Sequence, residues 1–436
     1  MNFIENIKKE RYEEFVKNHK TKSHFLQSYA WGEFSKKEKN MTPHYLGVED
    51  ENNNLIATAL LLQKHLPLGY SYFYSPRGFV IDFTDSETLS FFTEHLKEYI
   101  KNKKGIFLKI DPDIIWKEYD YKDNLVKDET EAKRIFYSLT KLGYTHLGFT
   151  KNFETMQPRY TFRISLKRPF EEIENNFTKT VKQRMKKGEE LGTRVTIGKS
   201  KDVKEFSHLM DLTEDRKDFL SHEYNYYKNL YDIYNKENKM TLFLGKIKPE
   251  YVIKKYQKEQ DEVIEKLKIL EQKENLSTAN QKKKNELAMR KNKLQEYIDE
   301  YNDAKNKYGK EITLNAHMLM EYGNKCWTLY AGNHNVLISS QANYKTYYEH
   351  IKYAHKHGFE YYDHFGTIGD LTKENPRYGL HIFKKAFGGN YIEFIGEFDL
   401  ILNKPLYFIF TKLVPLYRKL IRKLTKRKKE KELKLN

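Results

Sequence analysis

Apolar and polar positions along the first 110 residues predict a small α+β unit. Residues 42–66 have the pattern of a β-hairpin, because two apolar runs flank the Asp and Asn residues at 50–54. Apolar residues at helical spacing follow over 88–100. Residues 105–110 then form a short apolar strand, which must end or bend at Asp111-Pro112 because proline cannot donate to a strand ladder.

The second half of the chain repeats this plan. Residues 55–78 and 312–332 each contain an apolar strand, a turn and an aromatic strand that ends near a glycine. In the second copy a helix over 344–357 and a strand over 359–365 come next. We therefore predict the fold class α+β with two copies of one unit. The alternative is a chance similarity between aromatic-rich strands.

A segment over 248–309 interrupts the second copy. It is dominated by Lys, Glu, Gln and Asn, and its apolar residues recur at steps of three, four and seven. These residues are Ile253, Tyr256, Val263, Leu267, Leu270, Leu287, Leu294 and Tyr301. The spacing predicts an antiparallel helical hairpin, or coiled-coil arm, with its turn at 275–280. Gln260 falls on the apolar seam, so we expect an imperfect contact. The arm is a charged spacer or, alternatively, an RNA-binding element.

The segment over 406–436 combines apolar residues at helical spacing with concentrated positive charge. Residues 411–436 hold eleven Lys or Arg and two Glu, a net +9 of the formal +17 of the chain. A basic amphipathic tail suits an anionic membrane surface. The alternative is an apolar stripe packed on the domain, followed by a solvated tail. The overall charge is also compatible with nucleic acid or a phosphate-bearing substrate.

Cysteine usage and the N-terminus indicate a cytoplasmic protein, and the basic tail adds the expectation that it is peripheral on the inner face of the plasma membrane. Cys326 is the single cysteine, which excludes an intramolecular disulfide. Residues 1–15 lack the apolar core of a signal peptide, and no run of eighteen apolar residues predicts a spanning helix. Cys326 lies in an apolar strand beside Trp327, so we expect an inert thiol.

Several common kinds of site are absent from the sequence. The clustered histidines at 350, 355, 357 and 364 come without a spaced Cys set or a His-Glu-x-x-His pattern, so we predict no metal site and expect surface histidines. No phosphate-binding loop of the P-loop, dinucleotide or acetyl-coenzyme A type occurs. No nucleophile elbow occurs either. We therefore predict no cofactor, and an acyl donor other than coenzyme A.

One cluster near the C-terminus places two cations among aromatic residues. Lys384 and Lys385 lie between Phe383 and Phe387. A lysine held among apolar neighbours is a candidate anion site. The alternative is a structural helix with one buried and one solvated lysine.

Six stretches of the chain, taken in order, resemble the FemA/FemB/FemX aminoacyltransferases, which form peptidoglycan bridges. The stretches are Phe25-Leu-Gln-Ser-x-x-Trp31, Leu108-Lys-Ile-Asp-Pro112, Met156-Gln-Pro-Arg159, Trp327-Thr-Leu-Tyr-Ala-Gly332, Phe383-Lys384 with Phe387-Gly388, and Tyr391-x-Glu-Phe-Ile-Gly-Glu-Phe-Asp399. The resemblance spans nearly the whole chain, and the arm lies where staphylococcal-type members carry theirs.

The resemblance implies two tandem acetyltransferase-like (GNAT-like) domains. The first covers 1–155 and is completed by about 390–405, and the second covers 156–247 plus 310–389. It also implies transfer of glycine, alanine or serine from aminoacyl-tRNA to a stem-peptide amine. The acceptor would be lipid II or its soluble precursor, UDP-MurNAc-pentapeptide.

The resemblance also suggests roles for individual residues. Lys384 matches a lysine thought to steady negative charge during attack on the ester. Tyr330 and Tyr226 match tyrosines that help to hold the phosphates of the precursor. His222 stands where the family has a phosphate-binding arginine, so that contact is weakened or supplied by Arg216.

Further candidates are less well placed by the resemblance. Phe383 belongs to the same stretch as the essential lysine and is a candidate substrate contact. A family lysine near the N-terminal tryptophan aligns with Ser35, and Lys36 is one position away. Asp111 is a weak candidate for the base that deprotonates the incoming amine, and its alternative role is a turn cap.

Two other functions compete with this interpretation. A non-catalytic basic adaptor for RNA or membranes, built from degenerate acyltransferase domains, would also explain the arm and the tail. A coenzyme A-dependent N-acyltransferase is disfavoured because the pyrophosphate-binding loop is missing. The amino acid transferred, the acceptor diamino acid and the oligomeric state remain open at this point.

Overall fold

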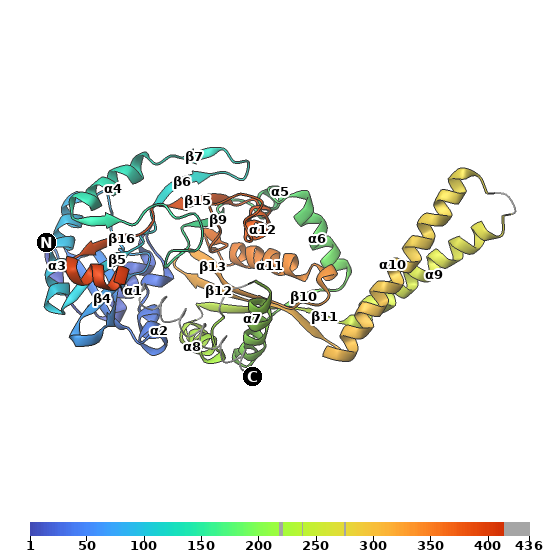
Figure 1. Cartoon of the computed structure of the whole chain (residues 1–436), viewed down its shortest axis with the longest axis horizontal. Helices are drawn as coiled ribbons and strands as arrows, with labels where there is room; N and C mark the ends of the chain where they lie inside the picture. Colours follow the sequence, from blue (N-terminus) through green and yellow to red (C-terminus); the bar gives the residue numbers. More distant parts are fainter. Residues whose placement is uncertain (218–220, 238, 274–275, 414–436) are drawn as a thin grey trace, which may run out of the picture. The chain divides into compact units, whose positions relative to one another are not determined.

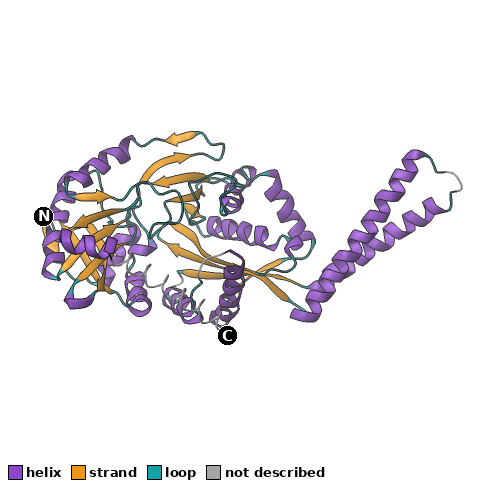
Figure 2. Ribbon diagram, in the orientation of Figure 1, coloured by secondary structure: helices purple, strands orange, loops and turns teal. Residues whose placement is uncertain are grey.

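Two β-sheets form the framework of the computed structural model (Figures 1 and 2). The structure describes residues 1–217, 221–237, 239–273 and 276–413. These divide into unit 1, which contains 1–162, 366–382 and the chain from 390 onward, and unit 2, which contains 163–365 and 383–389. Residues 366–382, assigned to the second domain from the sequence, thus lie in unit 1.

Unit 1 is built on a seven-stranded sheet. All its neighbouring strands are antiparallel except β4 and β5, which are parallel. The strands, in sheet order, are β1 (Asn2–Ile4), β2 (Thr42–Glu49), β3 (Leu55–His65), β4 (Ser71–Ser75), β5 (Gly105–Ile110), β16 (Phe398–Ile401) and β8 (Tyr144–His146). The predicted turn at 50–54 is present, because the Asp50 carboxylate accepts hydrogen bonds from the backbone of Asn52 and Asn54.

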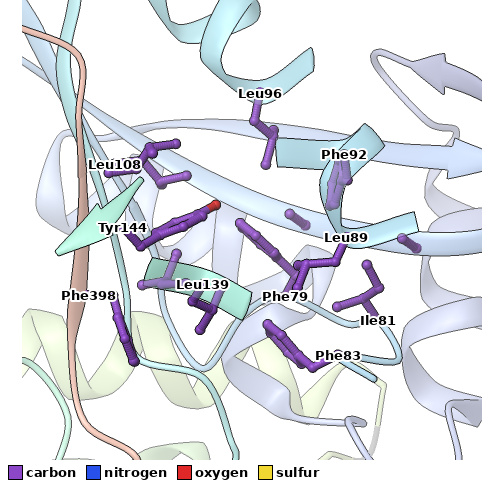
Figure 3. Close-up of a cluster of buried hydrophobic side chains, with 14 of the residues drawn as sticks. Phe79, Ile81, Phe83, Leu89, Phe92, Leu96, Leu108, Leu139, Tyr144 and Phe398 are labelled. Carbon is purple, nitrogen blue, oxygen red and sulfur yellow. The ribbon is translucent and has the colours of Figure 1, made fainter. Parts of the chain in front are cut away.

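The helices of unit 1 surround this sheet, and a small ribbon of strands lies in the same unit. The helices are α1 (Lys9–Asn18), α2 (Tyr29–Lys39), α3 (Ser86–Asn102), α4 (Thr130–Lys141) and α13 (Lys404–Phe408). The ribbon has the order β15 (Asn390–Phe394), β6 (Ile115–Tyr119) and β7 (Leu125–Lys127). Figure 3 shows the core, where Phe79 and Phe92 meet Leu108, Leu139 and Phe398.

Unit 2 is built on a second sheet. Its strands, in order, are β10 (Arg194–Ile197), β11 (Met240–Ile247), β12 (Ile312–Tyr322), β13 (Lys325–Asn333), β14 (Tyr361–Asp363) and β9 (Tyr160–Ser165), the last of which crosses the division between the units. The helices are α5 (Phe170–Asn175), α6 (Lys179–Glu190), α7 (Val203–Lys217), α8 (Tyr224–Asn235), α9 (Pro249–Glu271), α10 (Thr278–Tyr308) and α11 (Ala342–Lys356). Helix α12 (Tyr378–Lys385) begins in unit 1 and ends in unit 2.

The two units share one arrangement of strands. In unit 1, β3 and β4 are antiparallel, α3 follows, and β5 lies parallel to β4. In unit 2, β12 and β13 are antiparallel, α11 follows, and β14 lies parallel to β13. The repeated α+β plan predicted from the hydrophobic pattern is therefore confirmed. The strand expected over 359–365 is shorter than predicted, since β14 ends at Asp363.

The inserted segment forms the predicted helical arm, with α9 and α10 packed side by side (Figure 1). Ser277 caps α10 by accepting a hydrogen bond from the backbone of Asn280, and Gly309 ends the helix at a positive φ of 97°. The seam residues of α9 are buried, as their spacing indicated. Gln260 donates to the carbonyl of Lys291 at 3.3 Å and to the Gln295 side chain at 3.0 Å. The polar position on the seam is thus hydrogen-bonded across the arm.

The C-terminal segment of unit 1 is helical as far as it is described. Helix α13 continues as one π-helical turn over Ile409–Leu413, and residues 414–436 of the predicted tail lie outside the described residues. Among the described residues, no helix has the length and apolar character needed to span a bilayer.

Replacement of Leu294 by alanine should loosen the arm without affecting unit 1. The Leu294 side chain is fully buried between the arm helices, so its truncation should cost about 2–5 kcal/mol locally. Hydrogen exchange followed by mass spectrometry should show faster exchange in α9 and α10 alone. Met289→Ala is the control, because that side chain is 73% exposed on the same helix. Equal exchange in the two variants would contradict the packing described here.

Candidate functional site

Lys384 is a buried cation in unit 2. Its side chain lies on the last turn of α12 and only 6% of the residue is exposed. The ammonium donates hydrogen bonds to the backbone carbonyls of His364, at 2.8 Å, and Phe365. A charge removed from water needs such partners, because an uncompensated buried ion is very costly. The lysine therefore points into the interior, where its charge acts through a medium less polarisable than water.

Aromatic rings surround the end of α12 that carries this lysine. The Phe383 ring contacts Tyr344 at 4.9 Å, Tyr347 at 5.0 Å and Phe387 at 5.4 Å between ring centroids. All three contacts are edge-to-face, a geometry that aromatic pairs favour. Phe383 is thereby fixed in place and forms part of a cleft wall.

A cleft of about 510 Å³ in unit 2 opens against Phe383. Arg184 from α6 lies over the Tyr344 ring at 4.9 Å and donates to the Tyr344 hydroxyl at 2.6 Å. Amide side chains contribute to the lining, at Asn315, Asn333, Gln341 and Asn343. Aromatic faces, amides and one guanidinium can together bind a flat polar ring with an attached anion.

A second cluster in unit 2 brings together Tyr226, Tyr330 and His222. The two tyrosine hydroxyls are 3.0 Å apart, and the His222 ring stacks on Tyr226 with centroids 3.7 Å apart. Tyr227 joins them, because its hydroxyl accepts a hydrogen bond from the His222 backbone at 3.1 Å. Burial and the neighbouring Tyr226 raise the pKa of Tyr330 well above its usual range, so Tyr330 keeps its proton as a hydrogen-bond donor.

A bulge in β13 directs Tyr330 toward this cluster. Leu319 pairs with Thr328 and Met318 pairs with Tyr330, so Leu329 is an extra residue in the ladder. Thr328 contacts His350 of α11 at 3.1 Å, whereas Tyr330 contacts α8. Without the extra residue, positions 328 and 330 would face the same side of the sheet.

The remaining predicted site residues lie elsewhere. Lys36 is exposed near the end of α2 in unit 1, and Ser35 beside it is buried. Arg216 belongs to α7, but its side chain is outside the described residues. Neither observation assigns a role, so both residues stay predictions from the family resemblance.

Asp111 is a buried carboxyl in unit 1. It accepts hydrogen bonds from the Arg77 backbone at 2.6 Å and the Tyr74 hydroxyl at 2.8 Å. Asp111 thus caps a turn, as its alternative role predicted, but the turn lies 34 positions earlier, where the Gly78 N–H donates to the Ser75 carbonyl. Burial raises the pKa of Asp111 to about 6, and the positive charge of Arg77 opposes that rise. A carboxyl with this pKa can take up a proton near neutral pH, so Asp111 stays the candidate base.

Two of the four clustered histidines are not on the surface. His350 and His364 are fully buried in the core of unit 2, which corrects our expectation of surface histidines. Burial lowers the pKa of both rings well below the usual value, and the nearby Lys384 charge lowers that of His364 further. Among the described residues, no three His, Cys, Asp or Glu side chains are grouped to bind a metal. Burial raises the pKa of the Cys326 thiol, consistent with an inert cysteine.

Some of the residues in the six stretches hold unit 1 together. The Gln27 side chain donates to the Pro76 carbonyl at 2.7 Å and accepts from the Leu60 backbone at 2.9 Å. Arg159 is 4% exposed and donates to the Phe394 carbonyl at 2.9 Å. These side chains satisfy the hydrogen bonds of buried backbone groups, so their role in unit 1 is structural.

Sequence reasoning missed Arg184 and Tyr344 of the cleft, and it missed Asp363, which bonds to the turn that holds Lys384. No motif marks the first two, which approach each other across 160 positions of sequence. Asp363 could have been found, because it ends the strand that repeats the one before Asp111.

Comparison with known proteins agrees with the six stretches. A model of the FemAB family matches residues 7–414. The chain belongs to the FemAB family. A lipid II:glycine glycyltransferase of Staphylococcus epidermidis is 30% identical over 414 residues, covering 94% of this chain and 95% of that protein. A protein of the same name from Staphylococcus aureus is 30% identical over 431 residues, covering 98% and 99%.

A solved structure extends the similarity to the fold. The crystal structure of FemX has 30% sequence identity and a TM-score of 0.74, and the match covers 94% of this chain and 99% of that one. The predicted fold class is thus confirmed, including the helical arm. Membership of the FemAB family also confirms that the chain is an aminoacyltransferase, as the resemblance implied.

Replacing Asp111 with asparagine should remove one pH-dependent contribution to stability. The pKa of the folded state, about 6, lies above the ordinary value of 3.8. The group therefore stabilises the fold below about pH 4, and this contribution, about 3 kcal/mol, is lost as the pH rises through 6. Chemical unfolding at pH 4.5 to 7.5 should show a flatter stability profile for Asp111→Asn than for the wild type. Parallel profiles would contradict the raised pKa.

Proposed function

We propose that the chain transfers glycine, alanine or serine from aminoacyl-tRNA to the side-chain amine of the stem peptide of lipid II. The observation that carries the proposal is the buried ammonium of Lys384, in the stretch that matches the essential lysine of the family. The relatives named as lipid II:glycine glycyltransferases support lipid II as the acceptor and glycine among the donors. Alanine and serine, which are also small amino acids, remain candidates for the amino acid that is transferred.

The chemistry needs little covalent help from the protein. The ester of aminoacyl-tRNA is already activated, and holding amine and ester together supplies much of the rate. The remaining requirement is stabilisation of the oxyanion that forms when the amine attacks. A cation held in a site with little water is most effective for this. Lys384 meets the requirement because its ammonium is buried and is fixed by two backbone carbonyls.

The cleft beside Phe383 is where we place the acceptor end of the tRNA. Its volume of about 510 Å³ suits a nucleoside-sized group, since ligand pockets span roughly 300–1,000 Å³. Tyr344 and Phe383 offer ring faces for a base, and Arg184 offers a guanidinium for a phosphate. Phe383 lines this cleft and precedes Lys384 in α12, whereas the Lys384 side chain is not part of the lining, so the ester has to extend beyond the cleft to reach the ammonium.

The Tyr226, Tyr330 and His222 cluster is our candidate for the phosphates of the acceptor. Tyrosine hydroxyls can donate to phosphate oxygens, and the raised pKa of Tyr330 keeps its proton in place. A histidine is mostly neutral at pH 7, so His222 is a weaker anion contact than an arginine.

The C-terminal segment of unit 1 supports contact with an anionic membrane. Tyr407 and Phe410 pack on the unit, against Phe107 and Tyr72 respectively. Other apolar side chains stay exposed, with Phe408 at 57% and Leu413 at 45%. Residues 414–436 then add ten Lys or Arg against two Glu. Apolar groups next to concentrated positive charge are the features that bind an anionic bilayer surface, where lipid II resides.

The transfer reaction tests the proposal directly. Purified protein is incubated with lipid II and with glycyl-, alanyl- or seryl-tRNA in turn, and the products are weighed by mass spectrometry. We expect the stem peptide to gain the mass of an amino acid residue, and Lys384→Met to slow the transfer by about 100- to 1,000-fold. Binding of lipid II should survive this substitution.

Two results would contradict this mechanism. A normal rate with Lys384→Met would remove the oxyanion role of the lysine. No mass gain with any charged tRNA would instead favour the non-catalytic adaptor. Lys385→Met is the matched control, because it removes a neighbouring charge that is less buried.

Removal of Tyr417 to Asn436 should weaken binding to anionic membranes. This segment carries most of the tail charge, and each basic residue near such a surface contributes on the order of 1 kcal/mol. The intact protein should sediment with phosphatidylglycerol-containing vesicles at low salt, and the truncated protein should stay in the supernatant. Pure phosphatidylcholine vesicles serve as the control. Co-sedimentation of the truncated protein would show that other residues make the contact.

A further inference from the structure

The carbonyls that hold Lys384 belong to a turn with an unusual backbone. The turn comprises Asp363, which is the last residue of β14, and the following His364 and Phe365. Phe365 has a positive φ of 49°, in the left-handed region that bulky side chains rarely adopt. Such a conformation persists only where surrounding contacts enforce it. Something must therefore hold this turn in the shape that directs two carbonyls at the ammonium.

The Asp363 carboxylate makes the contacts that hold the turn. One oxygen accepts a hydrogen bond from the Phe365 backbone at 2.8 Å, and the other pairs with the Arg163 guanidinium at 3.1 Å. Asp363 and Arg163 are cross-strand partners on β14 and β9, and their side chains are only 3% and 11% exposed. A buried bond of this kind between charged groups is strong and directional.

The ring of His364 restrains the middle of the turn. It is fully buried, with ring contacts to Tyr362 at 4.9 Å, Phe387 at 5.5 Å and Tyr347 at 5.6 Å. The first residue of the turn is thus held by an ion pair, the second by packing and the third by a hydrogen bond. The two carbonyls that face Lys384 have little freedom to move.

We propose that Asp363, oriented by Arg163, is a positioning residue for the ammonium of Lys384. This inference rests on the proposed role of Lys384 in transfer. Asp363 acts by fixing the carbonyls of His364 and Phe365, which in turn fix the ammonium. Charge stabilisation depends on the exact direction and distance of the donor, so a relaxed turn should slow the chemical step while leaving substrate binding intact.

Unit 1 provides a matched control for loss of a buried carboxylate. Asp399 on β16 is 2% exposed and pairs with its cross-strand partner Lys109 at 3.0 Å. It resembles Asp363 in burial and in having a cationic cross-strand partner, but it lies in the other unit. Asn is the substitution of choice at both positions, because it keeps the shape of the side chain and removes the charge.

The experiment compares Asp363→Asn with Asp399→Asn in single-turnover and steady-state transfer from aminoacyl-tRNA to detergent-solubilised lipid II. We expect Asp363→Asn to lower kcat about 10- to 100-fold, with KM for both substrates changed less than about threefold. Asp399→Asn should lower kcat less than about threefold. Thermal unfolding should show similar losses of Tm for the two variants. Equal kcat values for them would overturn the inference.

A double variant shows whether Asp363 acts through Lys384. In the Lys384→Met background, Asp363→Asn should lower kcat by less than about a further twofold, because the ammonium that Asp363 positions is already absent. A full additional 10- to 100-fold loss would mean that Asp363 supports the fold by another route, and would overturn the inference. Should Asp363→Asn fail to fold, Arg163→Lys tests the same link with the positive charge retained, and an unchanged kcat there would overturn it.

The two proposals fail in different ways. A normal transfer rate with Lys384→Met would end the oxyanion mechanism itself. A slow Lys384→Met variant together with an unaffected Asp363→Asn variant would end only the positioning role.

Discussion

A buried ammonium must be surrounded by oxygen atoms, and much of the candidate site follows from this requirement. Lys384 is 6% exposed, so the free energy of burying its charge has to be offset by hydrogen bonds to carbonyl oxygens. Those carbonyls come from the turn after β14, which in turn needs the Asp363 and Arg163 pair. Phe383 and Tyr344, which pack edge to face, form part of the wall of the neighbouring cleft.

Equivalent positions in the two copies of the folding unit carry aspartates that make different contacts. An aspartate ends or follows the parallel strand in each, Asp111 after β5 and Asp363 in β14. In unit 1 the carboxylate binds a distant loop through Arg77, and in unit 2 it binds the turn that holds a catalytic candidate. Unit 2 also has a bulge in β13 and the inserted arm, so the duplicated unit has diverged by local insertions.

The repeated order of hairpin, helix and strand and the inserted arm could be predicted because they depend on local periodicity. The seam of α9 is an example, since a step of three or four residues identifies one face of a helix wherever that helix lies. The histidines show the limit of this reasoning. His350 and His364 were expected on the surface, yet both are buried, because a histidine in a pattern of tyrosines and lysines does not reveal which neighbours will cover it.

The sequence by itself determined the α+β class, the repeated unit and the helical arm, because hydrophobic spacing is a property of neighbouring residues. The resemblance to the family made Lys384 the candidate catalytic residue. The tertiary structure alone decided which groups surround that lysine. Arg163 and Asp363 are 200 positions apart, and Arg184 and Tyr344 are 160 apart. Their approach depends on strand register and helix packing, which arise from the whole fold and leave no local signal in the chain.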